Sequence, residues 1–250
     1  MKASDKQDWS TQGLDVVYMC RTGRNEELVY SLRSICQNLK FNRVFIFGGK
    51  PDNIEPDVFV PLVQAGSTKW ERVHNNFMAV AKEKRLTDDI ILFNDDFFVM
   101  KPTDQLPPKY RCSMYEQIVS MEMKFGNTIT AYTKQLRKCV SQLDEIGKGH
   151  LSYELHIPMI INRKKLYEIL RKFPDGRATR TLYGNYAEIG GEQSQDFKIN
   201  DSGDRISPDW QFVSTMDNTF AIESVYGSII KAFPTPSRYE IVEKSHKKVD

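Results

Sequence analysis

Two adjacent carboxylates interrupt an apolar stretch of the sequence. Asn94, Asp95 and Asp96 stand between the apolar runs 90–93 and 97–100. Two ionised carboxylates side by side repel each other, and burial strengthens this repulsion unless a cation lies between them or both face water. Carboxylate oxygens suit Mg²⁺ or Mn²⁺, whose coordination is usually completed by waters and substrate phosphates. We therefore predict a divalent-cation site at Asp95 and Asp96.

The alternative for these acids is an exposed polar turn, which is our interpretation of Asp88 and Asp89. A solvated turn seldom has an apolar run on both sides, whereas Asp95 and Asp96 are flanked in this way. The flanking residues therefore favour the metal site, and Asn94 becomes a candidate contact for the same ligand.

Two further polar segments could contact an anionic ligand. In "RTGRNEEL", Arg21 or Arg24 could meet a phosphate and Asn25 could cap the helix that follows, with a plain polar turn as the alternative. Gly48 and Gly49 permit a close approach of the backbone or simply form a tight turn. Lys50 beside them could meet a phosphate.

Other candidates are spread along the chain. Asn75 and Asn76, in "KWERVHNNF", could bind a base or a sugar, although a polar helix face explains them equally well. His156, Asp196 and Asp217 are candidate general bases. The alternatives are a hydrogen-bonded core residue for His156 and a helix cap for Asp217.

The segment 179–201 mixes glycines, amides, acids and bases, which is typical of a binding loop. Four candidate acceptor-binding residues lie in it: Arg180, Tyr183, Asn185 and Glu192.

Strands that alternate with helices must position these residues. Apolar runs predict strands at 14–20, 43–49, 57–62 and 89–93, and helical spacing predicts helices at 25–39 and 68–84. This alternation predicts an α/β fold with a mostly parallel sheet flanked by helices. The ligand crevice of such a sheet lies at the carboxyl ends of its strands, where segments 21–25, 48–50 and 94–96 fall. We therefore expect three separate segments to converge on one crevice.

The sequence changes character after Pro102. The elements expected there are helices at 127–146, 163–173 and 219–234 and strands at 154–162 and 210–217. The first of these helices would form an insertion after the acid pair. We expect a single domain at 13–242, with a donor-binding half (13–102) and an acceptor-binding half (103–242). A flexible N-terminus (1–12) and a flexible tail (243–250) would flank it.

Size and composition fit a soluble globular protein. The chain has 250 residues, of which 40% are hydrophobic and 27% charged. Its formal net charge of +2 lacks the strong bias of a dedicated nucleic-acid binder. No Walker loop, GxGxxG or GxSxG motif is present, which disfavours a P-loop kinase, a Rossmann dehydrogenase and a serine hydrolase. No run approaches the roughly 20 apolar residues that span a bilayer.

Cysteine usage points to a reducing compartment. Cys20, Cys36, Cys112 and Cys139 form no CxxC pair and no Cys/His cluster, so we interpret them as buried free thiols. Only four histidines occur in the chain, which disfavours a His-rich zinc site. The N-terminus is polar and lacks a signal-peptide pattern, which together with free thiols indicates the cytoplasm.

Several segments resemble nucleotide-sugar glycosyltransferases of GT-A type. They are "LDVVYMCRTGRNEELVYSLRSI", "RVFIFGGKP", "KWERVHNNFMAVA" and "DDIILFNDDFFVMKP", followed by "ELHIPMIINR", "RTLYGN", "DFKI", "STMDNTF" and "FPTPSRYE". Within that group they look most like the Stealth-related sugar transferases and glycosyltransferases of bacteriophages and actinobacteria. The resemblance spans residues 14–240.

The resemblance implies a GT-A-like fold, a UDP-sugar donor and a divalent cation, Mn²⁺ or Mg²⁺. Asp95 and Asp96 would match the metal-binding acids, and His156 would match a histidine that follows them. The nucleotide pocket would be lined by Arg21, Gly23, Asn25 and Glu26. Two departures are evident: the acids read NDD instead of DxD, and "MCRTGRN" replaces a Trp-Val-Asp-Gly type of strand end.

The acceptor is open at this stage. Phage relatives imply a hydroxymethylated base in DNA, and a locally basic second half is compatible with phosphate attraction, although an ordinary solvated face is the alternative. The basic residues are Arg137, Lys138, Lys148, Lys164, Lys165, Arg171 and Lys172. A glycan is the other acceptor. Stealth relatives imply transfer of a sugar phosphate to a glycan, and a non-catalytic nucleotide or nucleic-acid binding module is a third hypothesis, which the paired acids speak against.

Overall fold

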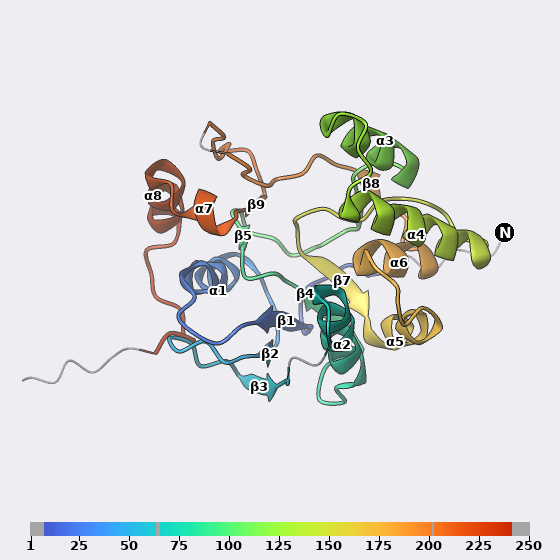
Figure 1. Ribbon diagram of the computed structural model, residues 1–250. Coiled ribbons are helices and arrows are strands. Elements are labelled where there is room, and N and C mark those ends of the chain that lie inside the picture. Colours follow the sequence, from blue (N-terminus) through green and yellow to red (C-terminus); the bar gives the residue numbers. More distant parts are fainter. Residues whose placement is uncertain (1–7, 64–65, 202, 242–250) are drawn as a thin grey trace, which may run out of the picture.

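A five-stranded sheet forms the centre of the molecule, whose computed structural model describes residues 8–63, 66–201 and 203–241 (Figure 1). The strands lie in the order β3 (Val58–Pro61), β2 (Val44–Gly48), β1 (Asp15–Cys20), β4 (Asp89–Leu92) and β7 (Met159–Asn162). The first four are parallel, and β7 pairs antiparallel with β4. The predicted α/β fold with a mostly parallel sheet between helices is confirmed.

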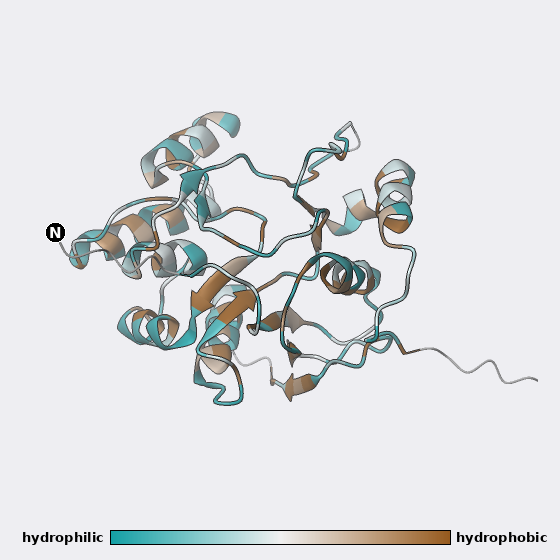
Figure 2. Ribbon diagram, turned by 180° about the vertical axis from the view of Figure 1, so that it is seen from behind, coloured by the Kyte–Doolittle hydropathy of each residue, from teal (hydrophilic) through white to brown (hydrophobic). Residues whose placement is uncertain are grey.

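Helices cover both faces of this sheet. β1, β2 and β4 consist mainly of apolar residues and are almost entirely buried, as expected of parallel strands covered on both sides. One face packs against α1 (Glu26–Asn38), and the other packs against α2 (Lys69–Lys82) and α5 (Arg163–Lys172). In Figure 2 the strands have hydrophobic colours, whereas the helices carry both colours, as amphipathic helices do.

Strand register brings three loops to one edge of the sheet. Cys20 pairs with Gly48, and β4 runs parallel beside β1, so all three strands end on the same side. Gly49 lies against the loop after β1, where an added Cβ atom would come within 2.3 Å of the Thr22 nitrogen. The predicted convergence of the three polar segments on one edge is confirmed.

The acid pair lies on a turn that connects two sheets. The backbone nitrogen of Phe97 donates to the Asn94 carbonyl at 3.2 Å, which closes the turn. The chain continues as β5 (Phe97–Val99), which pairs antiparallel with β9 (Phe212–Ser214) in a separate two-stranded sheet. The two apolar runs therefore belong to different sheets, and the acids occupy the junction.

The second half adds helices and one more short sheet. Its further elements are β6 (Lys109–Tyr110), α3 (Met114–Lys124), α4 (Ala131–Glu145), α6 (Thr179–Tyr186), β8 (Glu192–Gln193), α7 (Asp217–Phe220) and α8 (Glu223–Ala232). β6 and β8 pair in parallel. α3 and α4 form a helical insertion after the acid pair, of which the sequence pattern predicts only α4.

Two predicted elements have different bounds in the structure. The strand expected at 154–162 begins at Met159, because Pro158 has no backbone N–H to donate to a neighbouring strand. The helix expected at 219–234 consists of α7 and α8. They are separate because Ile222 adopts extended backbone angles (φ −68°, ψ 125°) between them.

The predicted burial of the thiols is correct for two of the four cysteines. All four are free; Cys20 and Cys139 are buried, Cys36 is exposed and Cys112 is partly exposed. Cys36 directly follows the buried Ile35 on α1, so it points about 100° away from the core-facing side.

Parts of the predicted termini lie outside the described residues, namely 1–7 of the segment 1–12 and all of 243–250. The division of 13–242 into a donor half and an acceptor half stays a prediction. Within the described ranges, no helix is both long enough and apolar enough to cross a membrane.

Gly49→Ala should lower the free energy of unfolding by about 3 kcal/mol, because the new methyl group would meet the backbone of Thr22. Chemical denaturation measures this change. The matched control is Gly227→Ala in α8, where nothing lies within 4 Å of the new Cβ. There we expect a gain of about 0.5–1 kcal/mol from helix propensity. Equal effects of the two substitutions would contradict the close approach at Gly49.

Candidate active site

Asn25 ties the acid turn to the start of helix α1. Its side-chain oxygen accepts from the Leu28 nitrogen at 2.9 Å, which confirms the predicted N-cap. Its side-chain nitrogen donates to Asp95 Oδ2 at 2.8 Å. One amide therefore caps the helix and orients a carboxylate of the turn that follows β4.

Asp95 lines two separate cavities. The first, of about 360 Å³, lies between the acid turn, α2 and the start of α6. It is lined by Met19, Trp70, Val73, His74, Asn76, Phe77, Phe93, Asn94, Asp95, Glu154, Gly176, Arg177, Ala178, Thr179 and Arg180. The second, of about 370 Å³, is lined by Arg21, Thr22, Arg24, Asn25, Glu26, Glu27, Asp95, Asp217 and Phe220.

The surroundings of Asp95 oppose its ionisation. Burial raises the pKa of this carboxyl, and the negative charge of Asp96 adds to the increase. The hydrogen bond from Asn25 and the positive charge of Arg21 act in the other direction without cancelling it. A ligand cation beside Asp95 would therefore relieve an unfavourable charge.

Asp96 has a different environment from its neighbour. Its Oδ2 accepts from Ser214 Oγ at 3.0 Å and lies 3.7 Å from the Lys198 ammonium. Of the described residues that line the two cavities, Asp95 is one and Asp96 is not. The two acids therefore point to different partners, one toward open cavities and one toward the protein.

Glu27 is a third acid at this edge, and no sequence motif singles it out. It accepts a hydrogen bond of 2.6 Å from Thr215 Oγ1. Burial raises the pKa of Glu27 from 4.5 to about 7, and the charges of Asp96, Asp95 and Asp217 raise it further against the effect of the Thr215 hydrogen bond. Glu27 is therefore an acid whose charged form is disfavoured by burial and by the carboxylates beside it.

His156 and Asp196, which the sequence suggests as separate candidate bases, form a pair. His156 Nδ1 lies 2.8 Å from Asp196 Oδ2, and the His156 backbone nitrogen donates to Asp196 Oδ1 at 3.1 Å. Arg111 also donates to Asp196. Burial alone would raise the pKa of Asp196, but the bonds and charges of His156 and Arg111 lower it to about 2. Asp196 is thus held as an anion that orients the imidazole.

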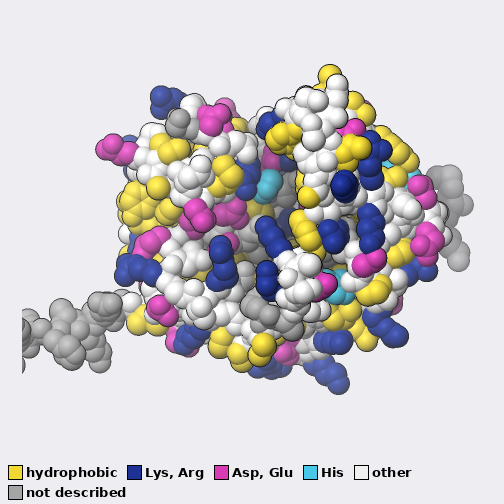
Figure 3. Space-filling model, in the orientation of Figure 1, with side chains coloured by type: hydrophobic (Ala, Val, Ile, Leu, Met, Phe, Trp, Pro, Cys, Tyr) yellow, Lys and Arg dark blue, Asp and Glu magenta, His cyan; other side chains and the backbone are white. Residues whose placement is uncertain are grey.

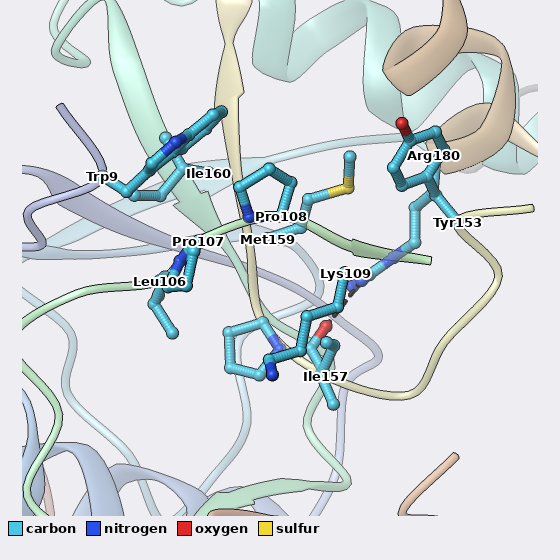
Figure 4. A pocket seen from close by; sticks show the side chains of 11 residues that line it. Trp9, Leu106, Pro107, Pro108, Lys109, Tyr153, Ile157, Met159, Ile160 and Arg180 are labelled. Atoms are coloured by element: carbon cyan, nitrogen blue, oxygen red, sulfur yellow. Dashed lines mark hydrogen bonds between the residues drawn. The ribbon is translucent and has the colours of Figure 1, made fainter. Parts of the chain in front are cut away.

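Arg180 lies between the pair and the acid turn. Its guanidinium donates to the Ile157 carbonyl at 2.6 Å, a bond drawn in Figure 4, and stacks over Phe97 at 5.3 Å. The His156 ring meets the edge of the same Phe97 ring, with centroids 6.4 Å apart. Burial lowers the pKa of Arg180, and the charges of Glu154, Asp96 and Asp196 only partly compensate. Phe97, directly after the acid pair, therefore joins both halves of the site.

A third, much smaller cavity is also lined by Arg180 (Figure 4). Its volume of about 10 Å³ is close to the space that one water molecule occupies. Because Arg180 also lines the cavity beside Asp95, its guanidinium separates the open site from the core.

Only some of the other predicted donor-binding residues line the two cavities. Asn76 and Asn94 line the first cavity, and Glu26 lines the second. Asn75 is exposed on α2. Lys50 forms an ion pair of 2.5 Å with Glu55, so its charge already has a partner. Gly23, Gly48 and Gly49 shape the loops at the sheet edge.

The predicted acceptor-binding residues also differ in position. Tyr183 is buried, and its hydroxyl accepts from the Asn162 nitrogen at 2.7 Å. Asn185 is buried too and bonds to the backbone of Leu151. Glu192 lies exposed in β8. We therefore carry only Arg180, among the four, into the proposed site.

The oxygen ligands at the acid turn fit a divalent cation that arrives with phosphate. Among residues 8–63, 66–201 and 203–241, no three His, Cys, Asp or Glu side chains lie close enough together to hold a metal ion. Mg²⁺ and Mn²⁺ are commonly held by one or two carboxylates and completed by substrate phosphates and water. Asp95 and Asp96 match that ligand type. Burial is the main cause of the raised pKa of Glu27, and the charges of Asp96, Asp95 and Asp217, which a cation would offset, add to it.

A groove runs across the face that carries these residues (Figure 3). It separates the side formed by α1, α7 and α8 from the side formed by α2, α4 and α6, and Lys and Arg side chains lie along it. The cavity of about 360 Å³ is lined from the α2 and α6 side and the cavity of about 370 Å³ from the α1 and α7 side, with Asp95 common to both.

Glu27→Gln should stabilise the protein at pH 8 and leave it nearly unchanged at pH 4.5. The folded state raises the Glu27 pKa from 4.5 to about 7, so folding takes up a proton between these values. Stability contributed by this carboxyl therefore falls as pH rises through this window, and the amide removes the loss. Thermal melting in EDTA measures the difference. Glu145→Gln, at an exposed site on α4, is the control, and a constant difference across pH would disprove the assignment.

Comparisons with known proteins give weak structural similarities. No protein-family model matches the sequence, and no curated protein matches it. The structure is similar to mouse xyloside xylosyltransferase 1 in its apo form, with 11% identity, a TM-score of 0.38, and coverage of 82% of this chain and 99% of that chain. It is also similar to the glycosyltransferase GlyE of Streptococcus pneumoniae TIGR4. The apo form of GlyE has 10% identity and a TM-score of 0.34, and the match covers 75% of this chain and 46% of that chain. A second GlyE structure has 9% identity and a TM-score of 0.32, and the match covers 89% of this chain and 50% of that chain. All three TM-scores are below 0.5, so the function proposed below rests on the geometry of the site.

Proposed function

We propose that this chain is a GT-A-like glycosyltransferase that moves a sugar from a nucleotide-sugar donor, a UDP-sugar, to an acceptor hydroxyl. The observation that carries the proposal is the position of Asp95. It lies on the turn after the parallel strand β4, at the ligand edge of the sheet, lines two cavities, and is unfavourably charged without a cation.

A divalent cation, Mn²⁺ or Mg²⁺, would be held by Asp95 and Asp96 and would supply charge neutralisation on the leaving diphosphate. Arg21 and Arg24 line the cavity on the α1 side of Asp95. Arg24 forms an ion pair of 2.5 Å with Glu26, so Arg21 would supply the positive charge there. Glu27, with a pKa of about 7, would be easily protonated or deprotonated as the charge beside it changes.

The cavity on the α2 side supports the binding of a planar or ring-shaped group. Trp70 lines it, and the Arg177 guanidinium lies 5.4 Å from the centre of the Trp70 ring. Asn76 and Asn94 offer amides to sugar hydroxyls or to a base from the same walls. An aromatic face with neighbouring amides is a suitable surface for a sugar or a nucleobase.

The His156–Asp196 pair supports proton transfer from the acceptor hydroxyl. Asp196, with a pKa of about 2, is too weak a base to take this proton near neutral pH, so its role is to orient the imidazole. His156 Nδ1 faces Asp196, which leaves Nε2 for the acceptor. Of the three predicted bases, we therefore assign proton transfer to His156. Asp217 lines the cavity on the α1 side together with Asp95 and Arg21, without a hydrogen-bonded imidazole beside it among the described residues.

A carbohydrate hydroxyl is the acceptor that the charges favour. Four of the seven basic residues that suggest DNA already have acidic partners: Arg137 with Glu122, Lys138 with Asp175, Lys148 with Glu188 and Lys164 with Asp88. A phosphate backbone would have to compete with these carboxylates, which weakens the case for a hydroxymethylated base in DNA. The free thiols agree with the expected cytoplasmic setting.

Transfer of a sugar phosphate is the second reaction compatible with this site. The same cation and diphosphate contacts would serve. The acceptor hydroxyl deprotonated by His156 would attack the phosphorus that carries the sugar instead of the anomeric carbon, the P–O–P bond would break, and UMP would leave. A binding module without turnover is disfavoured, because neither the acid turn nor an oriented imidazole benefits simple nucleotide binding.

Asp95→Asn should lower Mn²⁺-dependent turnover of UDP-sugars by at least about 100-fold, because the cation and diphosphate lose their carboxylate. UDP release from a panel of UDP-, GDP- and TDP-sugars measures the activity, with and without acceptor glycans or hydroxymethylated DNA. Asp88→Asn is the matched control, since Asp88 forms surface ion pairs with Arg163 and Lys164. Full activity of Asp95→Asn would sink the proposal.

His156→Gln should reduce kcat by about 100-fold or more while donor binding changes little, because proton transfer is lost and the donor contacts remain. Asp196→Asn should reduce kcat in the same way, by loss of imidazole orientation. The control is His150→Gln, which alters a surface His–Asp pair of 3.0 Å with Asp144. A loss of donor affinity without a loss of kcat would refute the assigned role.

A further inference from the structure

Lys198 places a positive charge on one of the two proposed cation ligands. Its ammonium lies 3.7 Å from Asp96 Oδ2, and the two side chains are each only 16% exposed. At that distance the contact is an ion pair and not a hydrogen bond. Within the described part of the chain, no hydrogen bond of this ammonium is found. Lys198 thus neutralises Asp96 while keeping its three N–H donors available.

The backbone holds Lys198 in this position. Lys198 forms a parallel bridge with Ser214 of β9, where the Ile199 nitrogen donates to the Ser214 carbonyl at 2.8 Å and the Ser214 nitrogen donates to the Phe197 carbonyl at 3.1 Å. β9 in turn pairs with β5, which begins directly after Asp96. The lysine and the acid are therefore aligned by neighbouring strands, and Ser214 contributes to both contacts.

This geometry conflicts with simultaneous binding of a cation at Asp96. A divalent cation bound to Oδ2 would lie within a few ångströms of the ammonium, and repulsion between like charges is strong where water is largely excluded. The flexible four-carbon stem of lysine allows the ammonium to move while the backbone stays paired. The displaced Lys198 ammonium could then donate a hydrogen bond to a phosphate oxygen of the ligand that accompanies the cation.

We propose that Lys198 is an internal counter-ion of Asp96, which an incoming divalent cation must displace. The inference rests on the proposed function, since it assumes that Asp96 binds the cation. It gives Lys198 a positioning role: the lysine keeps the acid turn in place without metal and weakens the binding of metal alone. Cation binding is thereby coupled to the arrival of a phosphate that receives the displaced ammonium.

The test is Mn²⁺ binding to the full chain without nucleotide. The electron paramagnetic resonance signal of free Mn²⁺ measures how much of the ion is bound. Lys198→Met should bind Mn²⁺ at least about 10-fold more tightly than the wild type, because the competing charge is gone. Lys198→Arg, which keeps the charge, should stay within about 3-fold of the wild type. Lys101→Met is the control, since the Lys101 ammonium donates to the Asp209 carbonyl away from the acids.

Adding UDP separates a counter-ion from a passive structural contact. In the wild type UDP should increase Mn²⁺ affinity, and in Lys198→Met this increase should be at least about 3-fold smaller, since no ammonium is released to the phosphates. Unchanged or weaker Mn²⁺ binding by a folded Lys198→Met protein would overturn the inference. A melting curve shows whether that protein is folded.

Asp96→Asn distinguishes failure of the inference from failure of the proposed function. If Asp96→Asn weakens Mn²⁺ binding but Lys198→Met leaves it unchanged, the cation site stands and only the counter-ion role falls. If Asp96→Asn and Asp95→Asn both leave Mn²⁺ binding unchanged, the cation site of the proposed function falls and the inference falls with it. In the Asp96→Asn background, the Lys198→Met effect should shrink to below about 3-fold, as expected of a pair that acts together.

Discussion

Repulsion between carboxylates at one edge of the sheet is the constraint on which the rest of the site depends. Asp95, Asp96, Glu27 and Asp217 approach one another there, and the pKa of Glu27 responds to all three of the others. The chain gives each of the first three a different partner: an amide for Asp95, a hydroxyl and an ammonium for Asp96, and a hydroxyl for Glu27. The neutral amide of Asn25 does not offset the burial of Asp95, so the charged form of this acid stays unfavourable.

These partners come from distant parts of the chain, so the fold and the site depend on the same contacts. Asn25 precedes α1, Ser214 ends β9, and Thr215 follows it. A substitution that separates β9 from β5 would therefore also change the charges around the acid turn. Since a buried carboxylate without a partner is strongly destabilising, loss of one polar partner should affect stability and ligand binding together.

The sequence predicts the parts of this structure that depend on local pattern. Buried strands, the helix cap at Asn25 and the convergence of three loops follow from apolar periodicity and from the general behaviour of parallel sheets. The sequence also nominates Asp95, Asp96, His156 and Asp196 as chemically active. Tyr183 and Asn185 show the limit of such reasoning. Their polar groups look equally suited to a ligand, yet they bond to the backbone inside the core, because a buried polar group must find a partner.

Pairings across long sequence separations could not be predicted from one sequence. Asp196 and His156 are in contact although 40 positions separate them in the sequence, and 118 positions separate Ser214 from Asp96. No local spacing encodes such contacts, since they follow from strand pairing and loop closure. Glu27 is the clearest case: as the second residue of a helix it reads as an ordinary acid near a positive helix end, and only tertiary burial raises its pKa to about 7.

The difference between Asp95 and Asp96 has a structural cause in the turn that contains them. Adjacent residues in a strand point to opposite faces, and the turn after β4 retains part of that divergence. Asp95 consequently faces the open cavities, whereas Asp96 faces β9 and Lys198. Two carboxylates that faced the same cavity would bind a cation tightly but repel each other strongly in its absence. By turning one acid toward an internal ammonium, the chain reduces this repulsion in the folded state, while Asp95 stays open to the cavities.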